Sequence, residues 1–217
     1  MAGRGIMNTL SALQYLARKD PVLKGIMKKA SALRLEPDTK RSIFEALVRA
    51  IAHQQLHGRA ARQILSRFLA LFPETKKFPK PAMVLRIPAK KLRAVGFSRA
   101  KVKAIRDIAA RAAKGKIPTK KETTQMSDEE VIAALLPLRG VGRWTAEMIL
   151  IFTLGRTDVL PVDDFGIREG FRIAYKKRTQ PKPKALAAYG ARWAPWRSIA
   201  SLYLWRVADK TKRARPS

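Results

Sequence analysis

The chain of 217 residues contains no cysteine. This absence excludes disulfides, thiolate-bound zinc, iron–sulfur clusters and a cysteine nucleophile, and it is typical of a reducing compartment. Histidine is also scarce, with two residues, and acidic residues number only 16. A metal site built from protein ligands is therefore not expected, and the sequence predicts no cofactor.

Long apolar runs are missing as well. No stretch approaches the roughly 18 apolar residues that a membrane-spanning helix needs, and residues 1–20 lack the apolar core of a signal peptide. We therefore expect a protein that stays inside the cell, in the cytoplasm or nucleoid of a bacterium or in the nucleus of a eukaryote.

Acidic residues are outnumbered by basic ones. The 46 lysines and arginines leave a formal net charge of +30, and a field of this size attracts polyanions such as nucleic acid or an anionic membrane surface. The apolar share of 47% is too high for a disordered basic tail. Charge alone would suit a ribosomal or chromatin protein equally well, so it indicates the partner and not the activity.

Strand-like alternation of β-branched residues is absent too, and apolar residues repeat with helical spacing instead. Ile43, Leu47 and Ile51 lie four residues apart and predict one apolar helical face. Ser127 and Glu130 form a capping box that opens another helix. The sequence therefore predicts an all-α fold.

Residues 138–145 read L-R-G-V-G-R-W-T and run into an apolar helix that we expect over about 143–154. Gly140 and Gly142 bracket Val141 at the start of that helix. Glycines there permit a tight turn and a close approach to a partner. The unpaired N–H groups of a helix start are a phosphate-binding site, so this segment is a candidate contact to nucleic acid.

Two arginines, Arg139 and Arg143, flank the glycines and would add positive charge to a phosphate site. A G-x-G pair at a helix start also occurs in ordinary helix–turn–helix corners. On these residues alone, both interpretations stay open.

Adjacent carboxylates, Asp163 and Asp164, lie within L-P-V-D-D-F-G-I, residues 160–167. Two neighbouring acids repel each other unless the structure stabilises them, and the apolar residues around them predict that at least one is partly buried. One aspartate is expected to cap the helix that begins near Phe165, which leaves the other for a functional role.

These segments together resemble the HhH-GPD superfamily of DNA glycosylases, whose hairpin reads L-P-G-V-G and whose Gly/Pro-rich loop carries an aspartate further along the chain. Arg139 stands where that family usually has proline. The resemblance covers about residues 40–210. In the branch that the chain resembles most, the second aspartate of P-x-D-D-x-x-I is catalytic. The resemblance therefore implies Asp164 as the catalytic carboxylate and leaves Asp163 as the helix cap.

In relatives that also cut the DNA backbone, a lysine follows the hairpin and forms a Schiff base with the sugar. This chain has Trp144 there, and an indole has no amine for that chemistry. The chain is therefore similar to the monofunctional 3-methyladenine DNA glycosylase II group, in which this tryptophan stacks on the flipped base. The resemblance also implies Met148 and Trp205 as base-pocket residues. Trp193 and Tyr203 are interpreted as core residues.

The segment I-A-H-Q-Q-L-H-G, residues 51–58, matches a region that faces the DNA in relatives and fills the space left by the extruded nucleotide. The sequence does not discriminate which side chain fills that space. The resemblance implies a DNA-binding role for the following residues of this segment and of the hairpin: Gln54, Gln55, Leu56, His57, Gly140, Val141, Gly142 and Arg143.

We expect a single HhH-GPD glycosylase domain over residues 1–217, with two helical subdomains and a DNA-binding cleft between them. One subdomain would combine about 1–40 with 157–217. The other would span about 41–156 and contain the helix–hairpin–helix, with its hairpin at 138–143.

The resemblance implies base excision repair of alkylation damage, in which a base of the 3-methyladenine or 7-methylguanine type is flipped out and its N-glycosidic bond is hydrolysed, without lyase activity. Trp144 and Asp164 would face each other across the cleft. We expect a monomer whose partner is double-stranded DNA containing alkylated bases, with no membrane involved. Two alternatives stay open: a non-catalytic helix–hairpin–helix DNA-binding protein, which needs neither residue, and a glycosylase for deaminated or etheno bases.

Overall fold

The structure, a computed structural model, divides the chain into two compact units. Unit 1 comprises residues 1–37 and 155–217, and unit 2 comprises residues 38–154. Every regular element in the described residues is a helix, which confirms the predicted all-α class. Among these helices, none combines the length and the apolar character that crossing a membrane requires. The structure describes the following residues: 2–30, 33–38, 40–56 and 58–213.

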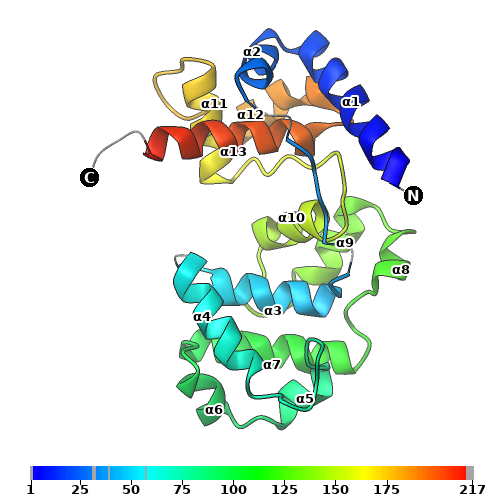
Figure 1. Ribbon diagram of the computed structural model, residues 1–217, viewed down its shortest axis with the longest axis vertical. Helices are drawn as coiled ribbons and strands as arrows, with labels where there is room; N and C mark the ends of the chain where they lie inside the picture. Colours follow the sequence, from blue (N-terminus) through cyan, green and yellow to red (C-terminus); the bar gives the residue numbers. More distant parts are fainter. Residues whose placement is uncertain (1, 31–32, 39, 57, 214–217) are drawn as a thin grey trace. The chain divides into compact units, whose positions relative to one another are not determined.

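Both units are built from helices joined by turns and loops (Figure 1). The helices of unit 2 in its described part are α3 (Ile43–His53), α4 (Gly58–Leu69), α5 (Pro81–Arg86), α6 (Ala89–Ala94), α7 (Arg99–Ala113), α8 (Lys120–Thr123), α9 (Asp128–Leu135) and α10 (Arg143–Phe152). Those of unit 1 are α1 (Ala2–Lys19), α2 (Pro21–Lys29), α11 (Phe165–Ala174), α12 (Pro183–Gly190), the 3-10 helix η1 (Ala191–Trp193) and α13 (Arg197–Arg213).

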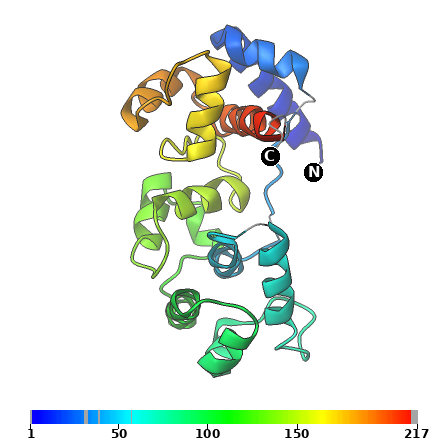
Figure 2. The same cartoon turned by 90° about the vertical axis from the view of Figure 1, so that its left-hand side faces the viewer.

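The core of unit 2 forms around α3, which contacts α4, α7 and α10. Ile43, Leu47 and Ile51 are buried on its inner face, as their spacing predicted. Helices α3 and α7 run side by side, since both lie lengthwise in Figure 1 and both are seen end-on in Figure 2. Val102 and Ile105 of α7 are buried as well. Each such side chain stabilises the fold by about 1.5–3 kcal/mol relative to an exposed one.

The helix before the hairpin has the capping box that the sequence predicted. Ser127 Oγ accepts a hydrogen bond from the Glu130 amide, and the Glu130 carboxylate accepts one from the Ser127 amide at 2.6 Å. Hydrogen bonding to Ser127, mainly to its backbone amide and then to its side chain, lowers the pKa of Glu130. The start of α9 is thereby fixed, and α9 packs against α10.

The core of unit 1 is formed mainly by α11 and α13, which make the most extensive helix–helix contact in the described residues. Gly170 of α11 permits this contact because a Cβ there would lie 2.0 Å from the main-chain oxygen of Leu204. Any larger residue would separate the helices. Trp193 and Tyr203 are buried, which confirms their interpretation as core residues.

A buried carboxylate joins the N-terminal helices to the rest of unit 1. Asp20 is 0% exposed and caps α2 by accepting from the amides of the first turn. Its Oδ2 also accepts from the Tyr175 hydroxyl at 2.6 Å and from Trp193 Nε1 at 2.9 Å. Burial, together with the neighbouring Asp20, raises the pKa of Tyr175 far above its ordinary value. Tyr175 therefore stays a hydrogen-bond donor, and α1 and α2 are attached to the C-terminal half of the chain.

Candidate active site and DNA-binding elements

The predicted hairpin is a tight turn between α9 and α10. The Val141 amide donates to the Leu138 carbonyl at 3.1 Å, which closes the turn. Gly140 has a φ of +79°, in the left-handed region that favours glycine. A Cβ at this position would lie 3.2 Å from Ile51 Cδ1 and 3.3 Å from Ala104 Cβ. Gly140 is therefore needed both for its backbone conformation and for packing of the hairpin against α3 and α7.

The N-terminus of α10 follows directly from this turn. Gly142 is the N-cap in an extended conformation, with no side-chain cap. Backbone bonding within the helix begins with the Ala146 amide, which donates to the Gly142 carbonyl at 3.1 Å. The amides of the first turn, starting with Arg143, therefore do not donate within the helix. The positive end of the helix dipole lies at these amides, and it suits an anion such as a DNA phosphate.

The side chain of Arg143 binds carboxylates of its own unit. Its guanidinium forms a bidentate pair with Glu129 of α9 and a 3.2 Å contact with Glu147, one turn further along α10. The hydrogen bond to Glu129 is the main reason that the pKa of Arg143 is raised. From the sequence, this side chain was expected to add positive charge at a phosphate site. The structure instead uses that charge to join α9 to α10, which leaves the backbone amide for a phosphate.

Trp144, the second residue of α10, is 44% exposed, which is unusual for an indole. Met148 lies one turn later and is half-buried. Residues four apart share one face of a helix, so the two side chains belong to the same side of α10. An exposed indole beside a flexible thioether is an adaptable surface for a flat ligand.

Asp164 is the N-cap of α11, and this corrects the expectation that Asp163 would be the cap. The helix begins at Phe165, so the residue before it takes the cap position, and Asp164 Oδ1 accepts from the Ile167 amide at 2.8 Å. Asp163 is exposed. The same Oδ1 of Asp164 accepts from Trp205 Nε1 at 2.8 Å. The carboxylate is therefore held by a helix amide and by an indole 41 residues away.

Gly166 makes room for this contact, and sequence reasoning missed it. A Cβ at Gly166 would lie 2.9 Å from Trp205 Cδ1 and 3.1 Å from Asp164 Oδ1. The signal was present in the sequence, because glycine is a poor helix former and is unfavourable in a first helical turn unless space requires it. Trp205 also lines a cavity of about 410 Å³ within unit 1, together with Leu33 and Arg34.

The end of α3 is a strained turn. Gln54 is the C-cap, and Gln55 has a φ of +55°, which is rare for a residue with a side chain. Gln54 Nε2 donates to the Gly140 carbonyl at 2.9 Å, so the turn and the hairpin are directly connected. Leu56 follows at 38% exposure. His57, the fourth candidate of this segment, lies outside the described residues.

Lys101 is a second residue that the sequence did not single out. It lies in the first turn of α7, and its ammonium group donates to the main-chain oxygens of Ala52 at 2.9 Å and Gln54 at 2.7 Å. Partial burial lowers the pKa of Lys101. Cations stabilise the C-terminal end of a helix, so Lys101 fixes the end of α3 from which the turn departs. No local signal distinguishes it from Lys103, the other lysine of α7.

In the described part of the chain, no three histidine or acidic side chains gather as a metal site would need. The side chains and backbone groups described above offer one carboxylate, two indoles and a set of helix-start amides. Asp164 and Trp205 belong to unit 1, and Trp144, Met148, the hairpin and the turn at Gln54 belong to unit 2.

Comparisons with known proteins identify a family, a relative and solved structures that are similar to this chain. The family model described as HhH-GPD superfamily base excision DNA repair protein matches residues 48–195. DNA-3-methyladenine glycosylase 1 of Schizosaccharomyces pombe is 40% identical over 180 residues, which are 82% of this chain and 78% of that protein. A solved structure of a Schizosaccharomyces pombe 3-methyladenine DNA glycosylase in complex with abasic DNA has a TM-score of 0.80 at 36% identity, covering 90% of this chain and 95% of that one. A DNA-3-methyladenine glycosidase structure from Bacillus halodurans has a TM-score of 0.80 at 32% identity, covering 92% and 89%.

Proposed function

Because the chain belongs to the HhH-GPD superfamily of base excision DNA repair proteins and is a DNA glycosylase, we propose that it releases alkylated bases and does so without cutting the DNA backbone. The substrate class is cationic bases of the 3-methyladenine and 7-methylguanine type in duplex DNA. The observation that carries this proposal is the Asp164 carboxylate, held by the Ile167 amide and by Trp205 Nε1.

Asp164 is proposed as the catalytic carboxylate. A base methylated at N3 or N7 is already a good leaving group, so little acid catalysis is required. The remaining demand is to stabilise positive charge on the sugar as the glycosidic bond breaks, and a preorganised carboxylate does this. The two N–H donors fix the position of Asp164 Oδ1 before substrate arrives. The same carboxylate would orient the attacking water.

Trp144 and Trp205 are each proposed to contact the extruded base, with Met148 beside Trp144. The face of an indole attracts cations, so a positively charged methylated ring is favoured without a pattern of hydrogen bonds to base edges. Exposure of the Trp144 ring supports this role. Trp144 also lacks the amine that a lyase would use to form a Schiff base with the sugar. This is why we propose a monofunctional enzyme.

DNA binding is proposed to use the first-turn amides of α10 and the turn at the end of α3. The first-turn amides of α10 would hold a phosphate, while the net charge of +30 supplies affinity that does not depend on sequence. Within the turn, the Gln54 side chain already bonds Gly140, whereas Leu56 presents exposed apolar surface. Apolar side chains are the usual wedges between bases, so Leu56 is proposed to fill the space left by the extruded nucleotide. The enzyme would act inside the cell, where chromosomal DNA is.

The test is incubation of the purified protein with duplex DNA that has been treated with a methylating agent, followed by chromatography of the released bases. Asp164→Asn is compared with wild type, and Asp163→Asn is the matched control because Asp163 is the exposed neighbouring acid. Asparagine is also a good N-cap, so Asp164→Asn should keep the fold, which a thermal unfolding measurement checks. Strand cutting is scored separately, without alkali.

We expect wild type and Asp163→Asn to release 3-methyladenine and 7-methylguanine without strand cutting, and Asp164→Asn to bind DNA but release neither. Release by Asp164→Asn at the wild-type rate would remove the catalytic assignment. Strand cutting by wild type would remove the monofunctional one. If no protein releases a methylated base, the same assay with ethenoadenine or hypoxanthine duplexes separates a different lesion class from a non-catalytic DNA-binding protein.

A further inference from the structure

A groove of about 960 Å³ lies in unit 2, and none of its lining residues is assigned above to base excision. Its walls come from the start of α3, the segment before α5, the end of α7 and the segment that leads into α8. Grooves of this volume are in the range of sites that bind small molecules or the side chains of a peptide.

The floor of the groove is apolar and rigid. Phe44 and Ile117 are buried beneath it, and Phe78 is half-buried. The Phe78 ring packs edge-to-face on Phe44 with centroids 6.0 Å apart, and the Arg49 guanidinium lies 5.4 Å from the Phe78 centroid. A partner side chain would therefore meet a preformed aromatic surface.

The rim of the groove is basic. Lys40, Lys77 and Lys80 line it and are exposed. The acidic residue among its described lining is Glu45, whose carboxylate is paired with Arg49 at 2.8 Å. The three lysines therefore create a positive field around an apolar floor.

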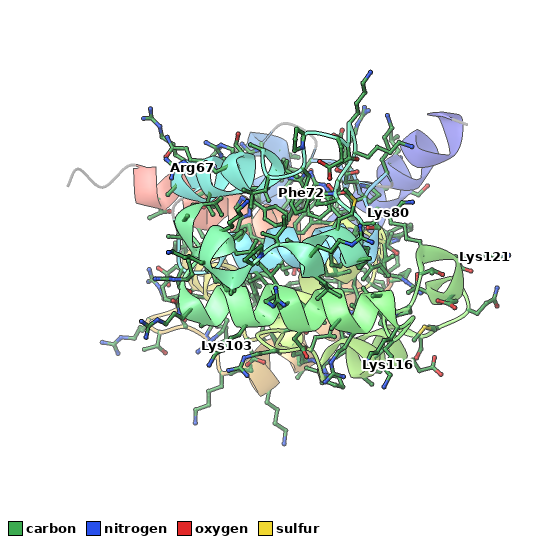
Figure 3. The ribbon with its side chains drawn as sticks, turned by 90° about the horizontal axis from the view of Figure 1, so that it is seen from below. Arg67, Phe72, Lys80, Lys103, Lys116 and Lys121 are labelled. Carbon is green, nitrogen blue, oxygen red and sulfur yellow. The ribbon has the colours of Figure 1, made fainter. Side chains whose placement is uncertain are left out.

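The groove lies at the end of α3 opposite to the turn at Gln54. The residues of α3 that line it precede Ala46, and the 11-residue helix separates the two ends by about 16 Å at 1.5 Å per residue. Helix α7 is arranged in the same way, with Ala112 at the groove and Lys101 at the turn. In Figure 3, Lys80, Lys116 and Lys121 lie toward one end of α7 and Lys103 toward the other. A duplex on the turn and the hairpin would leave the groove uncovered.

We propose that this groove is the docking site for an acidic peptide segment of another protein, which inserts an aromatic or large aliphatic side chain between the lysines. Charge complementarity identifies the occupant. A second copy of this chain carries +30 and would be repelled, and the C-terminal run Lys210–Arg215 is basic. A nucleic-acid backbone would satisfy the lysines but would cover the apolar floor with charge, which is unfavourable.

The test uses the full chain saturated with duplex DNA containing one abasic site, so that DNA-binding surfaces are occupied. The probe is a dye-labelled peptide rich in aspartate and glutamate with one central phenylalanine. Its binding is measured by fluorescence anisotropy at about 0.15 M salt. A second probe has alanine in place of the phenylalanine. The variant Lys77→Glu/Lys80→Glu reverses charge at the rim. Lys90→Glu/Lys91→Glu on α6 makes the same charge change at exposed positions outside the groove lining.

We expect the Kd of the phenylalanine peptide to increase about tenfold or more in Lys77→Glu/Lys80→Glu, to stay close to wild type in Lys90→Glu/Lys91→Glu, and to be weaker for the alanine peptide. Base release should be unchanged in both variants. Equal weakening in the two variants would overturn the proposal in favour of non-specific charge attraction. Equal binding of the two peptides would overturn the apolar anchor, and displacement of the peptide by further DNA would identify a nucleic-acid surface instead.

Discussion

The ammonium nitrogen of Lys101 lies 2.7 Å from the main-chain oxygen of Gln54, and the side chain of Gln54 in turn donates to the carbonyl of Gly140. Three segments far apart in the sequence are joined by this chain of hydrogen bonds: the start of α7, the end of α3 and the hairpin. The two proposed DNA-binding elements of unit 2 are thus held in a fixed relation to each other.

Replacing Lys101 with methionine should disturb that relation. The carbonyls of Ala52 and Gln54 would lose their donor, at a cost of about 1–3 kcal/mol in the free energy of unfolding. We expect the rate of base release from duplex DNA to fall further than stability alone explains. Urea unfolding and single-turnover assays measure the two effects. Lys103→Met, which removes an exposed charge two residues later, is the control and should retain both properties.

Leu56→Ala tests the proposed wedge. Extruding a base from a duplex costs a few kcal/mol, and a side chain that fills the gap offsets part of this cost. We expect release of a methylated base to slow by about tenfold in a paired duplex and to change little when the base is already unpaired in a bulge. Leu136→Ala removes another exposed leucine of unit 2 and should leave both rates unchanged. Equal slowing on both substrates would contradict the wedge.

Gly166→Ala tests the Asp164–Trp205 contact without changing either residue. The added methyl group would lie 2.9 Å from the indole, so Trp205 must move and its hydrogen bond to Asp164 should break. We expect base release to fall at least about tenfold, the loss typical of one disturbed catalytic interaction. Gly25→Ala, in α2, has open space around it. That control should raise stability by about 0.5–1 kcal/mol and leave base release intact.

Acid should weaken unit 2 through its glutamates. The hydrogen bond to Arg143 lowers the pKa of Glu129 from the ordinary 4.5, and cap hydrogen bonds lower the pKa of Glu122 and Glu130. A carboxyl with a lowered folded pKa contributes stability that is complete above the unfolded value and is lost as pH falls through the folded value. The midpoint temperature of thermal unfolding should therefore decrease as the pH is lowered below about 4.5. Glu129→Gln should reduce this dependence, whereas Glu74→Gln, at an exposed position, should not.

Asp20 is expected to dominate the stability of unit 1. Asp20→Ala would leave the buried donor of Trp193 and the half-buried donor of Tyr175 without their acceptor, and we expect a loss of about 3 kcal/mol or more. Tyr175→Phe removes a single donor and should cost about 1 kcal/mol. Urea unfolding compares them. Equal effects of the two variants would show that the carboxylate has no role beyond its bond to Tyr175.

The sequence predicted those features that depend on local spacing. The four-residue repeat of Ile43, Leu47 and Ile51 identified α3, and the pair Ser127 and Glu130 identified a helix start. The choice between two adjacent aspartates could not be made in the same way, because either one can cap a helix. In the structure Asp164 caps α11, and its hydrogen bond with Trp205 depends on tertiary structure.

Contacts between distant segments account for the other differences. The Trp205 indole that reaches Asp164 lies 41 residues later in the chain. Lys101 acquires its function only because α7 packs beside the end of α3. Arg143, interpreted as a charge for phosphate, is neutralised by Glu129 and Glu147 once the helices fold. The pair with Glu147 is four residues away on the same helix and could be predicted from the sequence, whereas the other pairings have no periodicity that a single sequence displays.

Unit 1 is assembled from the two ends of the chain, with unit 2 inserted between them. Its central carboxylate, Asp20, accepts a hydrogen bond from Trp193, which lies 173 residues later in the chain. During synthesis, unit 2 is a continuous segment and is able to fold first, whereas α1 and α2 emerge early and have no completed core to join. We therefore expect the contact between Asp164 and Trp205 to form late, once α13 has emerged from the ribosome. Nascent chains arrested before Trp205 should accordingly resist proteolysis in unit 2 and remain sensitive in α1 and α2.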